Sequence, residues 1–308
     1  MTDLTIIMYH YVRPIIGSKF PGIKGLEIKG FKRQLDFLEN NYSIVSSEDV
    51  LGKITKNKKL PPRACWLTFD DGYKDHYQYV LPELIKRNIT GAFFPPRMAI
   101  KNNKILNVNS IQHILSCSKN IKNLIYDLHE LIRQHGIKDK QIEKYYKLYG
   151  VANRFDSADI IFFKRMLQHI LPEKIRNEII STLLKKMIGI SETQLSNELY
   201  MNIKEVRKLV SNGMYVGSHG SEHHWLNKIS SEKQRSDISL SIEFLEEVGA
   251  PTSNWIMCYP YGAYNNITIS ILKELGAVIG ITTELRKANL ETDNPFTLPR
   301  LDTNDFPQ

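Results

Sequence analysis

The 308-residue sequence predicts an α/β fold of parallel β/α units, interrupted by a long helical segment. Short apolar stretches alternate with amphipathic helical patterns near both ends of the chain, which is typical of parallel β/α units. Between about residues 103 and 200 this alternation stops, and helical patterns follow one another with almost no strand signal. With 42% hydrophobic and 24% charged residues, the composition is that of an ordinary globular protein.

The N-terminal part of the chain alternates strand and helix patterns. Residues 4–12, LTIIMYHYV, are apolar and β-branched and predict a strand. Residues 31–41 repeat apolar side chains at helical spacing and end at two asparagines, so a helix is predicted there. After a short strand, Ser46 or Ser47 is a suitable N-cap for the next helix. The next predicted elements are a strand over residues 63–69, a helix over 76–88 and a strand over 90–96.

Residues 103–200 predict a helical insertion within one domain that spans residues 1–308. Apolar residues such as Leu124 and Leu128 recur at helical spacing, and glycine and proline are sparse. The insertion follows a strand end on the functional edge of the predicted sheet, where inserted segments tend to carry function. We therefore expect it to lie near this edge and to shape substrate choice. A contact between subunits is the alternative.

The alternation of helix and strand resumes after residue 200. Ser230 or Ser231 is a suitable N-cap for a long helix that Gly249 would end. The predicted elements of this part are helices over residues 202–213, 231–248 and 266–276, strands over 214–219 and 277–283, a strand into a turn over 254–262, and a last strand or extended segment over 296–303.

The net charge of +8 favours anionic partners in general, such as phosphate-bearing substrates. Lysine and arginine are scattered, however, and the densest cluster is KNKK at residues 56–59. A solvated basic surface is the simpler interpretation. Because no recognisable nucleic-acid-binding module accompanies the charge, we predict that nucleic acid is not a partner.

The sequence predicts neither a membrane-spanning segment nor a disulfide framework. No stretch approaches the roughly 20 apolar residues that a spanning helix needs. The N-terminus lacks a basic region and a cleavage site, so no signal peptide is predicted. The three cysteines are widely spaced and form no CxxC pair. We expect a cytoplasmic protein, with peripheral attachment at the inner membrane left open, and the sequence does not indicate an oligomeric state.

Unusual polar clusters follow three of the predicted strands. Asp70 and Asp71 end the strand in WLTFDDG, SHGSEHH carries His219 and His223, and YPYG occupies residues 259–262. The carboxyl ends of parallel strands face the functional side of a sheet or barrel, so the fold can bring these clusters together.

The residue types of these clusters fit a hydrolytic metal site. Two imidazoles four residues apart and one carboxylate can bind a divalent cation and leave positions open. A second carboxylate is then available to accept a proton from water that the cation activates. Each pattern alone has a simpler interpretation, because histidine pairs on exposed helices are common and Asp-Asp-Gly is also a turn sequence. His224 is expected at the surface or behind the ligands.

Three motifs in order, TFDDG (68–72), SHGSEHHWL (218–226) and YPYGAYN (259–265), resemble those of the polysaccharide deacetylase family of NodB-like, metal-dependent N-deacylases. The resemblance covers residues 1–100 and 200–308 and leaves the helical middle outside. It implies a distorted (β/α) barrel of the NodB-like type, here with a large helical insertion. It also implies one divalent metal ion, most often Zn²⁺, held by one aspartate and two histidines.

The resemblance assigns roles to residues that match the motifs. Asp70 corresponds to the catalytic base of the family, and Asp71, His219 and His223 correspond to the metal ligands. Tyr261 stands where the family uses a backbone N–H to donate to the developing oxyanion.

The sequence departs from the family pattern at three places. Gly220 replaces the usual serine or threonine after the first histidine, which removes a hydroxyl that helps to orient the loop. The arginine that commonly precedes the PYG turn is missing, and Arg300 is the candidate substitute, with a structural role as the alternative. No histidine follows His224 to act as general acid. A subgroup resembling the biofilm poly-N-acetylglucosamine deacetylases takes this acid from the N-terminal strand, and His10 fits that arrangement.

The predicted function is therefore a metal-dependent hydrolase that removes an N-acyl group, above all N-acetyl, from an amino sugar in a glycan or glycan precursor. A nucleotide- or lipid-linked sugar for surface polysaccharide biosynthesis suits the expected location. The alternatives are a sugar N-deformylase, hydrolysis of a non-sugar amide, and a carbohydrate-binding relative without activity.

Overall fold

A computed structural model describes residues 3–307, and these fall into two compact units. The barrel unit comprises residues 3–14, 25–104 and 196–307. The helical unit comprises residues 15–24 and 105–195. The N-terminal segment 15–24 joins the helical unit, which the sequence patterns do not indicate.

The strands of the barrel unit form a seven-stranded and a two-stranded sheet. The larger sheet has the order β5-β4-β3-β1-β8, with β2 paired to β3 and β9 paired to β1, and the smaller one joins β6 to β7. Every strand pair is parallel except β1 with β8. The strands are β1 (Asp3–Tyr9), β2 (Ser43–Ile44), β3 (Ala64–Asp70), β4 (Ala92–Phe94), β5 (Tyr215–Val216), β6 (Trp255–Cys258), β7 (Ala277–Ile281), β8 (Ala288–Asn289) and β9 (Leu301–Asp302).

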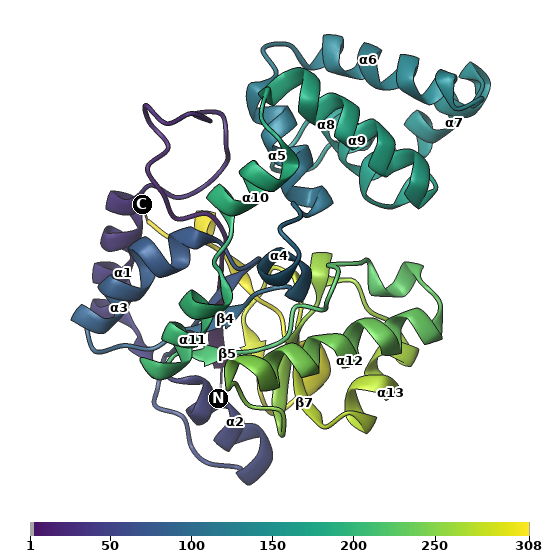
Figure 1. Ribbon diagram of the computed structural model, residues 1–308. Helices are drawn as coiled ribbons and strands as arrows, with labels where there is room; N and C mark the ends of the chain where they lie inside the picture. The colour runs from purple at the N-terminus through teal and green to yellow at the C-terminus, as the bar shows by residue number, and fades with distance from the viewer. Residues whose placement is uncertain (1–2, 308) are drawn as a thin grey trace. The chain divides into compact units, whose positions relative to one another are not determined.

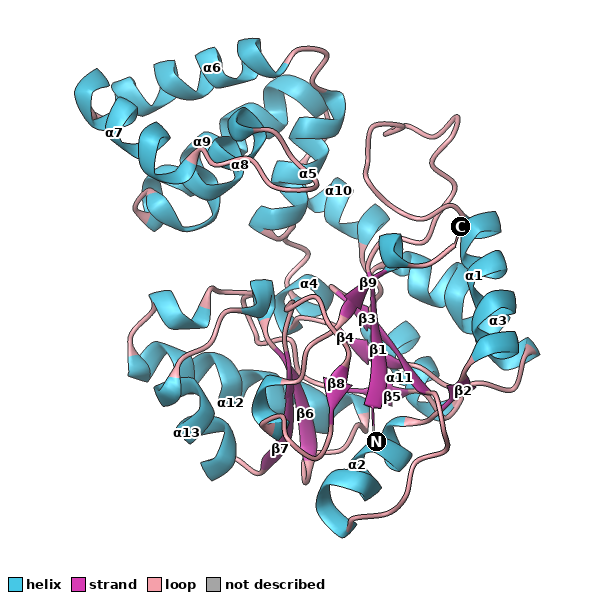
Figure 2. Ribbon diagram, turned by 180° about the vertical axis from the view of Figure 1, so that it is seen from behind, coloured by secondary structure: helices cyan, strands magenta, loops and turns pink. Residues whose placement is uncertain are grey.

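Two isolated bridges connect the sheets into a distorted barrel. Ser218, just after β5, pairs in parallel with Met257 of β6. Ile281 at the end of β7 pairs with Leu298, three residues before β9, which in turn pairs with β1. Backbone pairing thus runs around the ring, but through single bridges at two places, and this confirms the predicted distorted (β/α) barrel (Figure 2).

β1 and β3 lie at the centre of the barrel unit, and their burial there explains why their sequences are almost continuously apolar. All seven residues of β3 are buried, as expected for a parallel strand that is covered on both faces. The Phe69 ring stacks on Tyr9 at 4.9 Å and on Phe93 at 4.7 Å, measured between ring centroids. This core fixes the strand that ends at Asp70.

Helices surround the strands of the barrel unit, and α12 and α13 pack side by side next to β7 (Figure 1). Ser46 and Asp49 form a capping box at the start of α2, and Ser230 caps α12. Gly249 ends α12 in the left-handed conformation, with φ of 78°. The helices are α1 (Ile28–Asn41), α2 (Ser47–Lys56), α3 (Leu81–Lys86) after a π-helical turn at His76–Val80, α4 (Arg97–Lys101), α11 (Ile203–Ser211), α12 (Ser231–Val248) and α13 (Asn266–Glu274).

The helical unit contains helices and loops and no strand within residues 105–195. Phe20 packs edge-on against His113 at 4.8 Å, and Lys24 Nζ lies 2.8 Å from Asp156 Oδ1, so residues 15–24 are fixed to this unit. No helix between residues 3 and 307 combines the length and apolarity that a membrane crossing requires. The helices are α5 (Asn107–Cys117), α6 (Ile121–Gln134), α7 (Asp139–Tyr149), α8 (Ala158–Arg165) and α9 (Glu173–Ile188), and α10 (Glu192–Leu199) leads back to the barrel unit.

Candidate active site

A tight turn after β3 separates the two adjacent carboxylates. Asp71 has a φ of 69°, which aspartate tolerates better than most residues, and Gly72 has the same positive φ. A Cβ on Gly72 would lie 2.7 Å from the Cβ of Pro95, so the turn needs glycine here. As a result, Asp70 and Asp71 face different partners.

Asp71, His219 and His223 converge in the interior of the barrel unit. Asp71 Oδ1 lies 3.4 Å from His219 Nε2 and 3.3 Å from His223 Nε2, and the exposed fractions of the three residues are 3%, 2% and 8%. Among the described residues, Asp71 Oδ1 has no hydrogen-bond partner although it is buried. A buried carboxylate oxygen left unpaired between two imidazole nitrogens fits the ligand set of a divalent cation.

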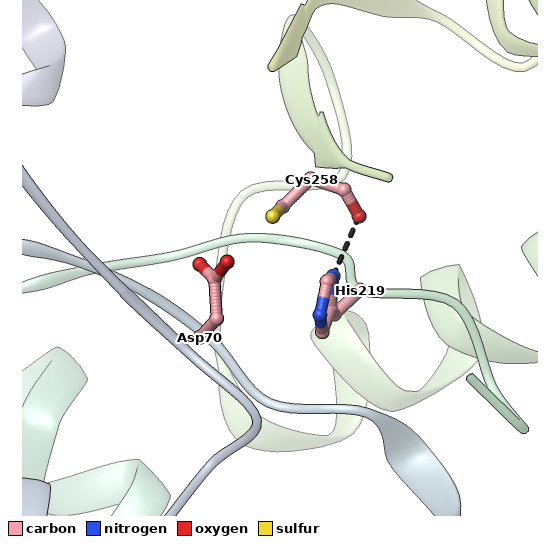
Figure 3. Close-up of side chains that lie close together, drawn as sticks. All are labelled: Asp70, His219 and Cys258. Atoms are coloured by element: carbon pink, nitrogen blue, oxygen red, sulfur yellow. Dashed lines mark hydrogen bonds between the residues drawn. The ribbon is translucent and has the colours of Figure 1, made fainter. Parts of the chain in front are cut away.

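The hydrogen bond of His219 orients its free nitrogen toward this centre. The Nδ1–H of His219 donates to the carbonyl oxygen of Cys258 at 2.7 Å (Figure 3). In the neutral ring, Nε2 therefore carries the lone pair, and Nε2 is the atom that faces Asp71.

A second group of potential ligands, Asp70, His219 and Cys258, is less suited to a cation. Both oxygens of Asp70 accept hydrogen bonds from Arg300. Burial raises the pKa of the Cys258 thiol, which disfavours the thiolate that a metal requires. The centre around Asp71 is therefore the better candidate.

Arg300 and Asp70 form a buried, bidentate ion pair. Arg300 Nη1 lies 2.9 Å from Asp70 Oδ1 and Nη2 lies 2.8 Å from Oδ2. Burial by itself would raise the pKa of the Asp70 carboxyl, but the guanidinium of Arg300, together with the nearby His219 and His10, lowers this pKa to about 2. Arg300 is held in turn by the Thr282 carbonyl and the Thr68 hydroxyl. The structure thus places Arg300 where it keeps Asp70 ionised.

The Arg300→Met protein is expected to lose roughly 3–5 kcal/mol of unfolding free energy, because it leaves a buried carboxylate without its counter-ion. Urea unfolding followed by circular dichroism measures this loss. Arg235→Met is the matched control, since Arg235 pairs with Glu274 at the surface and its removal should cost about 0–1 kcal/mol. Equal stability of the two variants would contradict the proposed pairing.

His10 lies beside Asp70 at the end of β1. Its Nε2 is 4.0 Å from Asp70 Oδ2, and its side chain is 38% exposed, so it can reach both the site and solvent. The Nε2–H of buried His76 donates to the backbone carbonyl of His10 at 2.8 Å. Burial lowers the pKa of His76 to about 4, which keeps this ring neutral. The sequence patterns do not predict that His76 contacts the backbone of His10.

Tyr261 lies next to His223 on the turn after β6. Its ring packs edge-on against His223 at 4.7 Å and stacks on Trp225 at the same centroid distance. The backbone of Tyr261 has a φ of 58°, and Gly262 follows with 65°. This turn brings residues 259–262 to the predicted metal ligands.

Asp237 of α12 anchors the loop that carries the two histidines, and the sequence gives little sign of this role. Its carboxylate accepts hydrogen bonds from the backbone N–H of Ser221 at 2.9 Å and of Glu222 at 2.8 Å. Gly220 has a φ of 70°, and a Cβ there would lie 2.6 Å from Asp237 Oδ2. The loop is therefore not loosened by the missing hydroxyl at Gly220, because Asp237 orients it from the helix. In the sequence, Asp237 is one of several acidic residues of a predicted helix, and no local pattern distinguishes it.

Comparison with known proteins points to one family. The chain matches the polysaccharide deacetylase family over residues 57–147 and 170–280. The match includes much of the helical segment, whereas the motifs alone place the whole segment outside the resemblance, so that part of the prediction is wrong.

Three relatives illustrate the likeness. YxkH of Bacillus subtilis (strain 168), whose name assigns it to the polysaccharide deacetylases, is 26% identical over 282 residues, covering 91% of this chain and 64% of YxkH. The deacetylase PplD of Streptococcus pyogenes, solved in complex with acetate, has a TM-score of 0.58 at 16% identity, covering 97% of this chain and 92% of PplD. IcaB of Ammonifex degensii has a TM-score of 0.57 at 17% identity, covering 98% and 91%. The two structures show a shared fold, and this chain spans less than two thirds of YxkH.

Proposed function

The chain belongs to the polysaccharide deacetylase family, and we propose that it is a metal-dependent hydrolase that removes the N-acetyl group from an amino sugar. The proposal rests on the different surroundings of two adjacent carboxylates, those of Asp70 and Asp71. Asp71 presents an unpaired, buried oxygen to two imidazoles, while Asp70 beside it is held ionised by Arg300. Hydrolysis of an amide at a metal centre requires these two roles, one carboxylate that binds the cation and another that accepts a proton from water.

Asp71, His219 and His223 would hold the cation, which we propose is Zn²⁺ because imidazole and carboxylate ligands in a three-residue set suit it. When bound, a divalent cation lowers the pKa of water toward neutrality and polarises an acyl carbonyl.

Two different residues, Asp70 and His10, would then carry out the two proton transfers. Asp70 accepts a proton from the attacking water, and Arg300 keeps it in the basic form. The backbone N–H of Tyr261 donates to the oxyanion of the tetrahedral intermediate. His10 donates a proton to the departing amine, since an amide anion is a very poor leaving group.

We expect the substrate to be a nucleotide- or lipid-linked precursor of surface polysaccharide that is handled in the cytoplasm. The test is a screen of zinc-loaded protein against N-acetylated and N-formylated nucleotide sugars and oligosaccharides, with product mass measured directly. Loss of acetyl supports the proposal, and loss of formyl alone identifies a deformylase. Binding without turnover identifies a carbohydrate-binding relative.

The His10→Gln protein is expected to retain metal and substrate binding but to lose amide turnover by about 10²–10⁴-fold, the usual contribution of a general acid. The loss should be much smaller for activated aryl esters, whose leaving group needs no proton. Steady-state kinetics on both substrate types measure the difference. His135→Gln, in the helical unit beside Glu178, is the control and should leave both rates unchanged. Equal losses for amide and ester would show that His10 is not the acid.

A further inference from the structure

The two oxygens of Asp71 have different surroundings. Oδ1 faces the Nε2 atoms of His219 and His223 and accepts no hydrogen bond from any residue between 3 and 307. Oδ2 accepts a hydrogen bond from the hydroxyl of Tyr73, at 2.5 Å. Tyr73 therefore holds the carboxylate through Oδ2, and Oδ1 faces the two imidazoles.

The Tyr73 ring is itself fixed by its neighbours. Tyr73 is fully buried, and Tyr11 stacks on it at 4.1 Å between ring centroids. Tyr200 lies parallel on it at 6.2 Å. Arg13 packs over the Tyr11 ring and forms a bidentate pair with Asp75. These contacts hold the Tyr73 ring in the position from which its hydroxyl donates to Asp71 Oδ2.

We propose that Tyr73 is a positioning residue for the metal ligand Asp71, an inference that rests on the proposed function. By donating to Oδ2, Tyr73 fixes the rotation of the carboxylate and reserves Oδ1 alone for the cation. A carboxylate that offers one oxygen leaves more of the coordination sphere open to water and substrate than one that binds through both. Hydrogen bonds to metal ligands typically contribute 10–100-fold to metal affinity, and Tyr73 is placed to supply this contribution.

The Tyr73→Phe protein tests the proposal, because phenylalanine keeps the ring and its stacking and removes only the hydroxyl. Zn²⁺ affinity is measured by competition with a chromophoric chelator, and the fold is checked by circular dichroism. We expect 10–100-fold weaker binding. Turnover should recover at saturating zinc, whereas a purely structural defect would persist. With Co²⁺ in place of zinc, the visible spectrum should also change, since Asp71 is then free to offer both oxygens.

Tyr215→Phe is the matched control. It also removes a buried tyrosine hydroxyl, one that accepts a hydrogen bond from the backbone N–H of Ile256, but it does not contact Asp71. Its zinc affinity should equal that of the wild-type protein. Zinc affinity of Tyr73→Phe within twofold of the wild type, with an unchanged Co²⁺ spectrum, would overturn the role of Tyr73. If the wild-type protein itself binds no zinc, the metal centre of the proposed function fails instead, so the two failures are distinguishable.

Discussion

The His219→Ala protein is expected to lose bound metal and turnover together. His219 supplies one of three ligand atoms, and the two that remain, on Asp71 and His223, cannot hold a divalent cation tightly. The loss of affinity should exceed the 10–100-fold cost of removing an outer partner of a ligand. Atomic emission measures the metal content after dialysis, and an amide hydrolysis assay of the same preparation measures turnover.

His224→Ala is the matched control for this experiment. His224 is the neighbour of the ligand His223, but its Nε2 lies 2.9 Å from Glu222 and takes no part in the cluster. This variant should retain one metal ion per chain and its turnover. A His219→Ala protein that keeps stoichiometric zinc would refute the ligand assignment.

The Asp70→Asn protein is expected to keep its metal and lose turnover by about 10²–10⁴-fold, because asparagine is nearly isosteric but cannot accept the proton. The substitution also leaves the buried guanidinium of Arg300 without its carboxylate, so unfolding should be measured alongside the kinetics.

Glu83→Gln separates the two effects of the Asp70 substitution. It likewise removes a carboxylate partner of a mostly buried arginine, Arg87, and it should lower stability without the same loss of turnover. Turnover of Asp70→Asn close to the wild-type rate, or losses of equal size in the two variants, would contradict the role of Asp70 as base.

Features encoded within a short stretch of sequence were predictable. The capping box at Ser46, the cap at Ser230 and the glycine that ends α12 all lie within a turn of the helix they bound. The strand ending at Asp70 was visible because β3 is covered on both faces and therefore reads as a continuous apolar run. Such signals are local, and the fold class follows from their order along the chain.

Contacts between distant segments were not predictable in the same way. Asp237 reaches the loop after Gly220 across 15 and 16 positions, and His76 reaches the His10 carbonyl across 66. Neither residue stands out in its own stretch of sequence, because an aspartate or histidine in a helical pattern is usually solvated. Arg300 could be named only as a substitute for a missing arginine, and its bond to Asp70 spans 230 positions.

The central claim is that the cation held by Asp71, His219 and His223 serves amide hydrolysis on an amino sugar. The most direct measurement follows acetate and free amine released from an N-acetylated glucosamine oligomer by zinc-loaded, chelated and reloaded protein. The claim predicts equal release of acetate and amine with zinc, loss of both after chelation, and recovery on reloading. Release that persists unchanged in fully chelated protein, or a protein with one zinc ion per chain that releases no acyl group from any amino sugar tested, would contradict it.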